Sequence, residues 1–258
     1  MRENPVKAAL KAGKTVVGAG LGVAANPLVV KILAQAGYDF LFVDTEHNMI
    51  APDTLVHVVQ MARSCGISPI VRPTDAEYHL IANALDTGAD GLIVPRVETA
   101  EQARRLVSYT KYPPVGVRGC GGSHTIDYQV LNWSEVVPWL NEQTLIATQV
   151  ESVRALDALD EMVQVPGVDA IIVGPTDLSI SLGVPGQNND PKMVAAIERV
   201  IATCNAHGKP CGIVLASGDA VAPWVKRGMR FVVAGSDSSM LLQMGMRNVQ
   251  AVRAAAGH

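Results

Sequence analysis

The sequence predicts a (β/α)8 TIM barrel, an α/β fold in which eight parallel strands alternate with helices around a closed sheet. Short apolar runs alternate with longer helix-like segments along all 258 residues. The apolar runs are nearly continuous, as in strands that are buried on both faces of a parallel sheet. We count eight such runs, each followed by a helix-like segment, and eight βα units suit closure into a barrel.

The predicted strands are short runs rich in valine, isoleucine and leucine. Runs of this length and composition are typical of buried strands. In chain order they are VVGAGLG (16–22), FLFVD (40–44), PIVR (69–72), GLIVP (91–95), LIATQVE (145–151), AIIVGPTD (170–177), CGIVLAS (211–217) and FVVAGSD (231–237).

Helix-like segments fill the intervals between these runs. Several end in glycine, which commonly follows the last residue of a helix. The clearest segments are 51–66, 75–89, 98–110 and 191–208. Residues 111–141 interrupt the alternation, between the fourth helix and the fifth strand. Long connections in compact domains are usually functional or disordered, and the two tryptophans in this one favour order.

A doubly wound open sheet would also alternate strands with helices. Its nucleotide-binding versions carry a glycine-rich GxGxxG or GxxxxGK loop after the first strand, and neither pattern follows residues 16–22. The barrel is therefore favoured. Because such barrels often reach about 200–250 residues as one domain, residues 1–258 are expected to form a single barrel domain.

Composition and charge exclude several classes of function. Apolar residues make up 48% of the chain and charged residues only 17%, which suits a compact core. A net charge of -3 gives no basic surface for nucleic acid. No apolar stretch approaches the roughly 20 residues that span a bilayer, so no membrane partner is expected. The four cysteines are scattered and form no CxxC pair, which favours a reduced, cytoplasmic compartment.

Ionisable and polar residues gather where the predicted strands end. The carboxyl ends of barrel strands meet at one mouth, which carries the active site, so we expect these residues to converge. Each one alone has an ordinary explanation, such as a carboxylate that caps the next helix. Together they predict an active site. They are Asp44, Glu46 and His47 at the end of the second strand, Arg72, Arg96, Gln149 and Glu151, and Gly174 to Asp177 at the end of the sixth.

These side chains suit metal-assisted enolate chemistry. Glu151 and Asp177 supply hard oxygen ligands that, with water and substrate oxygens, suit Mg²⁺, Mn²⁺ or a similar ion. Such an ion can hold a 2-keto acid and stabilise its enolate. Arg72 could donate to the developing oxyanion. Histidine titrates near neutral pH, so His47 suits the role of general base.

The positions of the lysines support a metal. A Schiff-base aldolase needs a lysine that projects into the barrel mouth. Lys14 and Lys209 precede predicted strands, and the other lysines fall in helices, loops or the N-terminal segment. If this barrel makes or breaks carbon–carbon bonds through an enolate, it is expected to use a metal.

Six segments form a specific combination in their order and spacing. They are FVDTEH (42–47), IVRP (70–73), LDTGADGLIVPRVETAEQA (85–103), YPPVGVRGCG (112–121), TQVES (148–152) and VGPTDLS (173–179). Together they resemble the HpcH/HpaI aldolase/citrate lyase family, and within it the class II, metal-dependent pyruvate aldolases. The resemblance implies a barrel of the phosphoenolpyruvate/pyruvate type whose last helix is exchanged between subunits. It also implies a homo-oligomer, typically a hexamer built as a trimer of dimers.

The resemblance further implies a metal and substrate site. Glu151 and Asp177 would bind a divalent ion, Mg²⁺, Mn²⁺ or Co²⁺. Gln149 would lie close to that ion. Thr176 and Asp177 would hold the pyruvate carboxylate through their backbone.

Three further roles follow from the same resemblance. His47 matches the family's base, and Arg72 matches the arginine that touches the pyruvyl oxygen. Asp86 matches an aspartate that reaches from a neighbouring subunit to the catalytic histidine. The implied reaction is reversible cleavage of a 4-hydroxy-2-keto acid to pyruvate and an aldehyde, through a metal-stabilised pyruvate enolate.

Some features leave the substrate open. Thr45 and Thr176 stand where many relatives carry glycine and alanine, and residues 119–128 differ more strongly from the best-known relatives. This loop is expected to meet the aldehyde. Oxaloacetate decarboxylation and acyl-CoA cleavage are alternatives on the same metal–enolate site. Residues 235–239, GSDSS, could cradle a phosphate or cap the last helix, and the cap is favoured.

Overall fold

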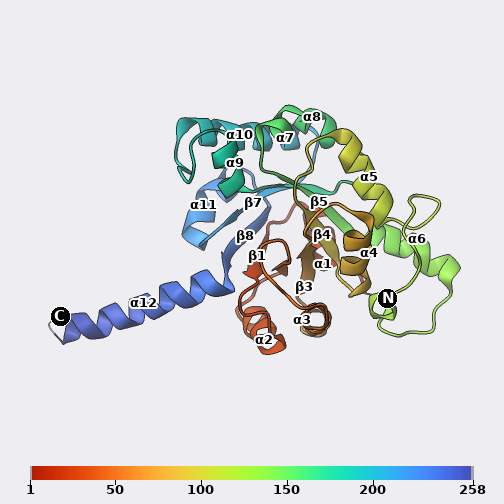
Figure 1. The fold of residues 1–258 in the computed structure, drawn as a ribbon, viewed down its shortest axis with the longest axis horizontal. Coiled ribbons are helices and arrows are strands. Elements are labelled where there is room, and N and C mark those ends of the chain that lie inside the picture. The colour runs from red at the N-terminus through yellow and green to blue at the C-terminus, as the bar shows by residue number, and fades with distance from the viewer. Residues whose placement is uncertain (1, 257–258) are drawn as a thin grey trace.

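A computed structural model of the protein describes residues 2–256. Its eight strands are parallel and close into a barrel in the order β1 to β8, surrounded by helices (Figure 1), so the barrel prediction is confirmed. The strands are β1 (Val16–Leu21), β2 (Phe40–Asp44), β3 (Ser68–Arg72), β4 (Gly91–Val94), β5 (Leu145–Val150), β6 (Ala170–Val173), β7 (Cys211–Leu215) and β8 (Phe231–Ser236).

The helices follow the strands as the alternation predicts. Proline or an asparagine, serine, threonine or aspartate cap opens most of them, as expected at helix N-termini. They are α1 (Pro5–Lys11), α2 (Pro27–Gln35), α3 (Pro52–Ser64), α4 (Tyr78–Asp86), α5 (Ala100–Thr110), η1 (Ser123–Ile126), α6 (Trp133–Gln143), α7 (Val153–Asp157), α8 (Leu159–Met162), α9 (Pro175–Ser181), α10 (Pro191–Ala206), α11 (Gly218–Lys226) and α12 (Asp237–Ala255).

The core has two layers, one inside the barrel and one between the strands and helices. Inside, the rings of Phe40 and Phe231 stack with their centroids 4.9 Å apart. Glycine makes room for this packing, because a Cβ on Gly18 would lie 2.3 Å from the Phe40 ring. The continuous apolar runs of the sequence thus fill both layers, and the polar strand ends lie beyond them.

The insertion between α5 and β5 is ordered, as its tryptophans predicted. It contains the short 3₁₀ helix η1 and the helix α6. Val136 and Leu140 of α6 pack with Tyr112 into a small separate cluster. The sequence analysis did not identify α6, whose Pro138 is atypical of a helix interior.

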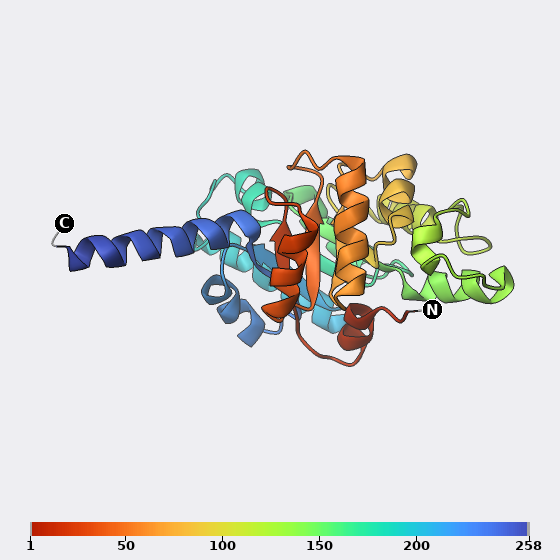
Figure 2. The ribbon, with the colours of Figure 1, turned by 90° about the horizontal axis from the view of Figure 1, so that it is seen from below.

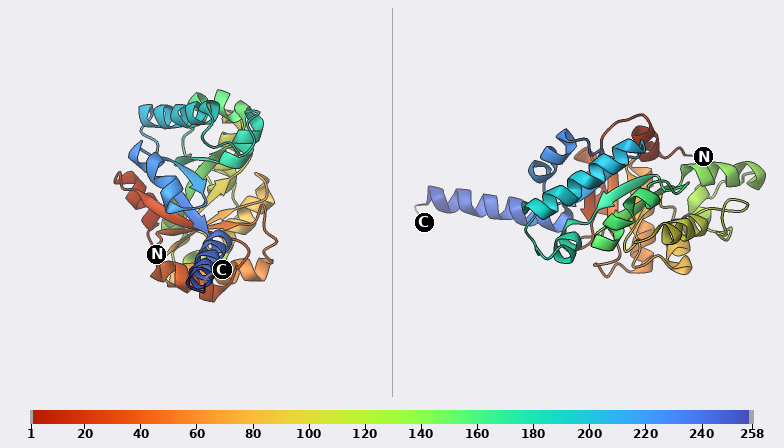
Figure 3. Two further views of the ribbon diagram at one scale, coloured as in Figure 1. Left: turned by 90° about the vertical axis from the view of Figure 1, so that its left-hand side faces the viewer. Right: turned by 90° about the horizontal axis from the view of Figure 1, so that it is seen from above.

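Helix α12 projects from the barrel, and its far end lies well away from the other helices (Figures 1, 2 and 3). Within this helix only Asp237, at its first position, is buried. Six of its large apolar side chains are exposed: Leu241, Leu242, Met244, Met246, Val249 and Val252. Among residues 2–256, no helix is long and apolar enough to cross a membrane.

Candidate active site

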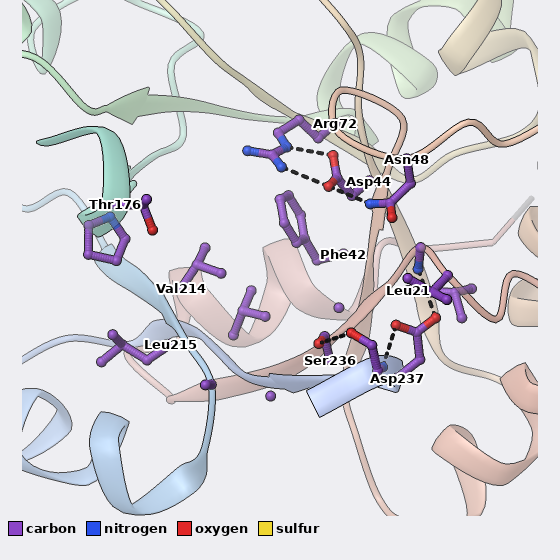
Figure 4. A pocket seen from close by; sticks show the side chains of 18 of the residues that line it. Leu21, Phe42, Asp44, Asn48, Arg72, Thr176, Val214, Leu215, Ser236 and Asp237 are labelled. Atoms are coloured by element: carbon purple, nitrogen blue, oxygen red, sulfur yellow. Dashed lines mark hydrogen bonds and ion pairs between the residues drawn. The ribbon is translucent and has the colours of Figure 1, made fainter. Parts of the chain in front are cut away.

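A cavity of about 380 Å³ opens at the carboxyl ends of the strands (Figure 4). Its walls come from the ends of β1, β2, β3, β7 and β8 and from the start of α9. Arg72, Asp44 and Asn48 form one polar side, and Thr176 lies on another. Phe42, Val214 and Leu215 make its apolar surface. The predicted convergence of strand ends is therefore present.

Arg72 is held at this mouth by two carboxylates. It is the register partner of Asp44 on the neighbouring strand. Its Nε donates to Asp44 Oδ1 at 2.8 Å, and its Nη2 lies 2.8 Å from Asp44 Oδ2. Its Nη1 lies 3.1 Å from Glu46 Oε2. Burial alone would raise the pKa of Asp44, but the hydrogen bonds and charge of Arg72 outweigh burial and hold this pKa below its ordinary value.

Glu151 follows β5 and is fixed by two donors. Its Oε1 accepts a hydrogen bond from the backbone N–H of Arg96 at 2.7 Å, and its Oε2 accepts one from Gln149 Nε2. Arg96 has a φ of 57°, in the left-handed region that non-glycine residues rarely adopt. Its side chain donates to Glu46 Oε1 at 2.9 Å. Arg96 thus links two carboxylates of the mouth, a role that the sequence analysis did not assign.

The surroundings of Glu151 are short of positive charge. Burial raises its pKa, and the nearby carboxylates of Glu46 and Asp177 add to this, while the two hydrogen bonds act in the opposite direction. A cation beside Glu151 and Asp177 would relieve this repulsion.

Neighbouring groups fit a metal ion at this position. Gln149 Oε1 is buried and lacks a hydrogen-bond partner within residues 2–256. Gly174 leaves space beside the carboxylate, because a Cβ there would lie 3.0 Å from Glu151 Oε2. The described residues contain no group of three or more histidine, cysteine or carboxylate side chains that could hold a metal. Two carboxylates, an amide oxygen, water and substrate oxygens nevertheless form a donor set that suits Mg²⁺ or Mn²⁺.

His47 lies at the rim, not on the cavity wall. Its side chain is 57% exposed, and its Nε2 is 3.7 Å from Glu46 Oε2. The loop that carries it is anchored by Asp44, which accepts hydrogen bonds from the backbone N–H groups of Glu46 and His47 and from Asn48 Nδ2. Asn48 is therefore a structural partner that the sequence analysis did not single out.

Thr176 and Asp177 belong to the first turn of α9. The sequence analysis placed residues 174–177 in a strand, which is wrong, because β6 ends at Val173 and the helix starts at Pro175. Proline favours the first helical position, where its missing N–H costs nothing. The backbone N–H groups of Thr176 and Asp177 have no acceptor in the part of the chain that the structure describes. They are free to receive a carboxylate.

Asp86 ends α4 and accepts a hydrogen bond from Arg118 Nη2 at 2.8 Å. It lines a second cavity, of about 810 Å³, which Asn48 and His124 also border. No hydrogen bond or ion pair between described residues joins Asp86 to His47. Its contact with the histidine of a neighbouring subunit stays a prediction.

The segment 235–239 caps the last helix, as favoured from the sequence. Ser236 and Ser239 form a capping box at the start of α12. Asp237 Oδ2 accepts from the backbone N–H groups of Gly22 and Ala24, at 3.0 and 2.6 Å. The N–H groups of Ser238 and Ser239 donate to Asp237 Oδ1 and Ser236 Oγ, so side chains already occupy helix donors that a phosphate would need. No lysine lines this mouth among the described residues, in agreement with the absence of a Schiff-base lysine.

Comparison with known proteins agrees with this geometry. The model of the HpcH/HpaI aldolase/citrate lyase family matches residues 22–243. The chain belongs to this family. A hydroxypyruvate/pyruvate aldolase of Delftia acidovorans is 37% identical over 254 residues, covering 97% of this chain and 93% of the relative. A 2-keto-3-deoxy-L-rhamnonate aldolase of Escherichia coli K12 is 37% identical over 240 residues, covering 92% and 88%.

A solved structure shares the fold closely. The crystal structure of an HpcH/HpaI aldolase from Desulfitobacterium hafniense DCB-2 superposes with a TM-score of 0.91 at 37% identity, over 96% of each chain. The predicted family is therefore confirmed, and with it an aldolase that acts as a carbon–carbon lyase. HpcH/HpaI aldolases generally depend on a divalent metal ion.

Proposed function

We propose that the protein is a class II pyruvate aldolase that reversibly cleaves 4-hydroxy-2-keto acids to pyruvate and an aldehyde. One observation carries the proposal most directly. Glu151 is half-buried, is held by two hydrogen-bond donors and lies near the charge of Asp177, at the same end of the barrel as Arg72. The family and the names of the relatives point to the same chemistry.

The pyruvyl end of the substrate binds at the barrel mouth, where β3 and β5 end and α9 begins. Glu151 and Asp177 would hold a divalent ion, with Gln149 close to it. When bound, Mg²⁺, Mn²⁺ or Co²⁺ supplies Lewis-acid stabilisation of the negative charge on the 2-keto oxygen. The N–H groups of Thr176 and Asp177 receive the substrate carboxylate. Arg72, fixed by Asp44, donates to the same keto oxygen as its charge grows.

His47 moves the proton. It takes the proton of the C4 hydroxyl, and the O–H electron pair forms the C=O bond of the departing aldehyde. The C3–C4 bond breaks, and its electrons form the enolate of pyruvate. Protonation of the enolate at C3 then gives pyruvate, and the reverse sequence makes the hydroxy-keto acid. The exposed rim position of His47 suits proton exchange with solvent.

The test is pyruvate release from a panel of 4-hydroxy-2-keto acids by chelator-treated protein, before and after Mg²⁺, Mn²⁺ or Co²⁺ is restored. We expect metal-dependent release, lost in Glu151→Gln and Asp177→Asn. Glu161→Gln, at an exposed glutamate of α8, is the matched control and retains activity. His47→Ala should lose aldol cleavage but still bind pyruvate. Metal-independent release, or full activity in Glu151→Gln, would reject the proposal.

We also propose a homo-oligomer, a hexamer of three dimers, in which α12 packs on a second subunit and Asp86 completes a neighbouring active site. The exposed apolar side chains of α12 support this arrangement. Mixing inactive His47→Ala and Asp86→Ala proteins should restore activity, because some sites then receive both intact residues. Leu242→Glu should reduce the mass measured by light scattering. No recovery on mixing would place Asp86 in its own subunit's site.

All four cysteines are free, which supports a cytoplasmic location.

A further inference from the structure

A further cavity, of about 450 Å³, lies at the end of the barrel opposite the candidate active site. Its walls include Leu145, the first residue of β5, and Pro210 and Arg230, which directly precede β7 and β8. It therefore opens at the amino ends of the strands, with the barrel core between it and the candidate active site. None of the residues assigned to the aldolase mechanism lines it.

This cavity has an excess of positive charge. Its charged lining is Lys7, Lys11, Lys209 and Arg230 against one carboxylate, Asp169, and His207 is also present. The excess stands out because the whole chain has a net charge of -3. Asp169 is already engaged, since its Oδ2 accepts from Lys7 Nζ at 2.9 Å and from the backbone N–H of Ile146 at 2.9 Å.

Two of the four cations have no partner. The guanidinium of Arg230 and the amine of Lys11 make no hydrogen bond or ion pair with any residue between 2 and 256. Lys7 pairs with Asp169 and also donates to the carbonyl oxygen of Thr144. Lys209 donates to the carbonyl oxygen of Val168, which orders it but does not neutralise it. Arg230 is half-buried and Lys11 is exposed, and both line the cavity.

The cations of the cavity also affect the pKa values of the lysines in and near it. Burial lowers the pKa of Lys111 to about 7, and the charges of Lys7 and Lys11 contribute in the same direction. Burial also lowers the pKa of Lys7, where Asp169 opposes the shift and Lys11 adds to it. A negative charge in the cavity would stabilise the protonated form of each amine.

We propose that this cavity binds a small dianion, a phosphate group or a dicarboxylate, with Arg230 and Lys11 as its principal ligands. The planar fork of Arg230 matches the paired oxygens of either group. The volume lies within the range of small-molecule sites, roughly 300–1,000 Å³. The dianion and the aldol substrate can be bound together, because the two cavities open at opposite ends of the barrel.

Isothermal titration calorimetry tests the proposal with inorganic phosphate and with succinate, each at constant ionic strength set by sodium chloride. We expect saturable binding of at least one of them, with one site per subunit. In the double variant Arg230→Gln, Lys11→Gln, the affinity should fall at least about tenfold, as expected when charge-assisted hydrogen bonds are lost. Phosphate alone or succinate alone would identify the class of ligand.

Two control variants distinguish binding in this cavity from binding at exposed surface positions and at the candidate active site. The double variant Arg105→Gln, Lys192→Gln removes the same charge from exposed positions outside the cavity and should bind as wild type does. Arg72→Lys should also keep the binding, since it alters only the candidate active site. Pyruvate release by the Arg230, Lys11 variant should be unchanged, which confirms that it is folded. No saturable binding, or equal affinity in the Arg230, Lys11 variant, would overturn the proposal.

Discussion

The two ends of the barrel have opposite imbalances of charge. Around the carboxyl-end mouth, five carboxylates face two guanidinium groups, whereas the amino-end cavity has four cations and one carboxylate. The carboxylates are Asp44, Glu46, Glu151, Asp177 and Asp237, and their cations are Arg72 and Arg96. At the amino end the cations are Lys7, Lys11, Lys209 and Arg230, and the carboxylate is Asp169.

The two ends differ in the sign of the ion that would balance their charge. The carboxyl end fixes its charges by hydrogen bonds and leaves Glu151 beside other carboxylates, an arrangement that a divalent cation completes. The amino end leaves Arg230 and Lys11 unpaired, an arrangement that an anion completes. In barrels of this kind the carboxyl end carries catalysis and the amino end stability. Here the amino end has, in addition, the chemistry of a binding site.

The largest effect is expected from a change at Arg72, which is held by Asp44 and Glu46 at the carboxyl-end mouth. Arg72→Lys keeps the positive charge but loses the fork that spans Asp44 and reaches Glu46. Because a donor to the developing oxyanion is lost, kcat/KM for aldol cleavage should fall by about 10²–10³. Arg227→Lys, at an exposed ion pair with Glu198, is the matched control and should be unaffected. Unchanged kcat/KM in Arg72→Lys would show that charge alone suffices at this mouth.

A smaller effect is expected from filling the space beside the metal ligands. Gly174→Ala would place a Cβ 2.7 Å from Gln149 Nε2 and 3.0 Å from Glu151 Oε2. Its φ of -94° is open to alanine, so the conflict is with these two side chains and not with the backbone. A displaced ligand should lower kcat by about 10² and raise the metal concentration needed for activity. In Gly218→Ala the added Cβ meets nothing within 4 Å. Equal activity of both variants would remove Gly174 from the site.

The contrast between the ends also explains what the sequence could predict. Runs such as Phe40–Asp44 are identified because a buried parallel strand needs continuous apolar residues, and the polar residue that follows marks its carboxyl end. Arg72 and Glu151 were found in this way. Arg96 was not assigned a role, because its contact with Glu151 is made by the backbone N–H in a left-handed conformation. No side-chain pattern reports such a contact.

The amino-end cavity was missed for a related reason. Its cations come from α1 and from the residues before β7 and β8, so they are far apart in sequence and none belongs to a motif. The start of α9 was missed for a different reason. Pro175 was included in a predicted strand, although proline favours the first position of a helix. Contacts between distant segments decide the amino-end cavity, whereas a residue type marked the start of α9.

The smallest expected effect is the pH dependence of stability that buried Lys111 causes near the amino end. Burial lowers the pKa of Lys111 from 10.5 to about 7, with the charge of Lys7 next in effect. Between these pKa values the unfolded chain retains a proton that the folded protein has released. The free energy of unfolding therefore rises with pH in this window, by at most about 1.4 kcal/mol per pH unit, and the full cost of the buried charge is present below it. Lys111→Met removes this dependence.

Urea unfolding at pH 7 and pH 9 measures the change. The increase in the free energy of unfolding should be smaller in Lys111→Met than in wild type, whereas exposed Lys192→Met should follow wild type. Comparing the increase, and not the stability itself, separates titration from the hydrogen bonds that Lys111 donates to the carbonyl oxygens of Asn141 and Thr144. An equal increase in all three proteins would mean that these carbonyl groups keep Lys111 protonated in the folded protein.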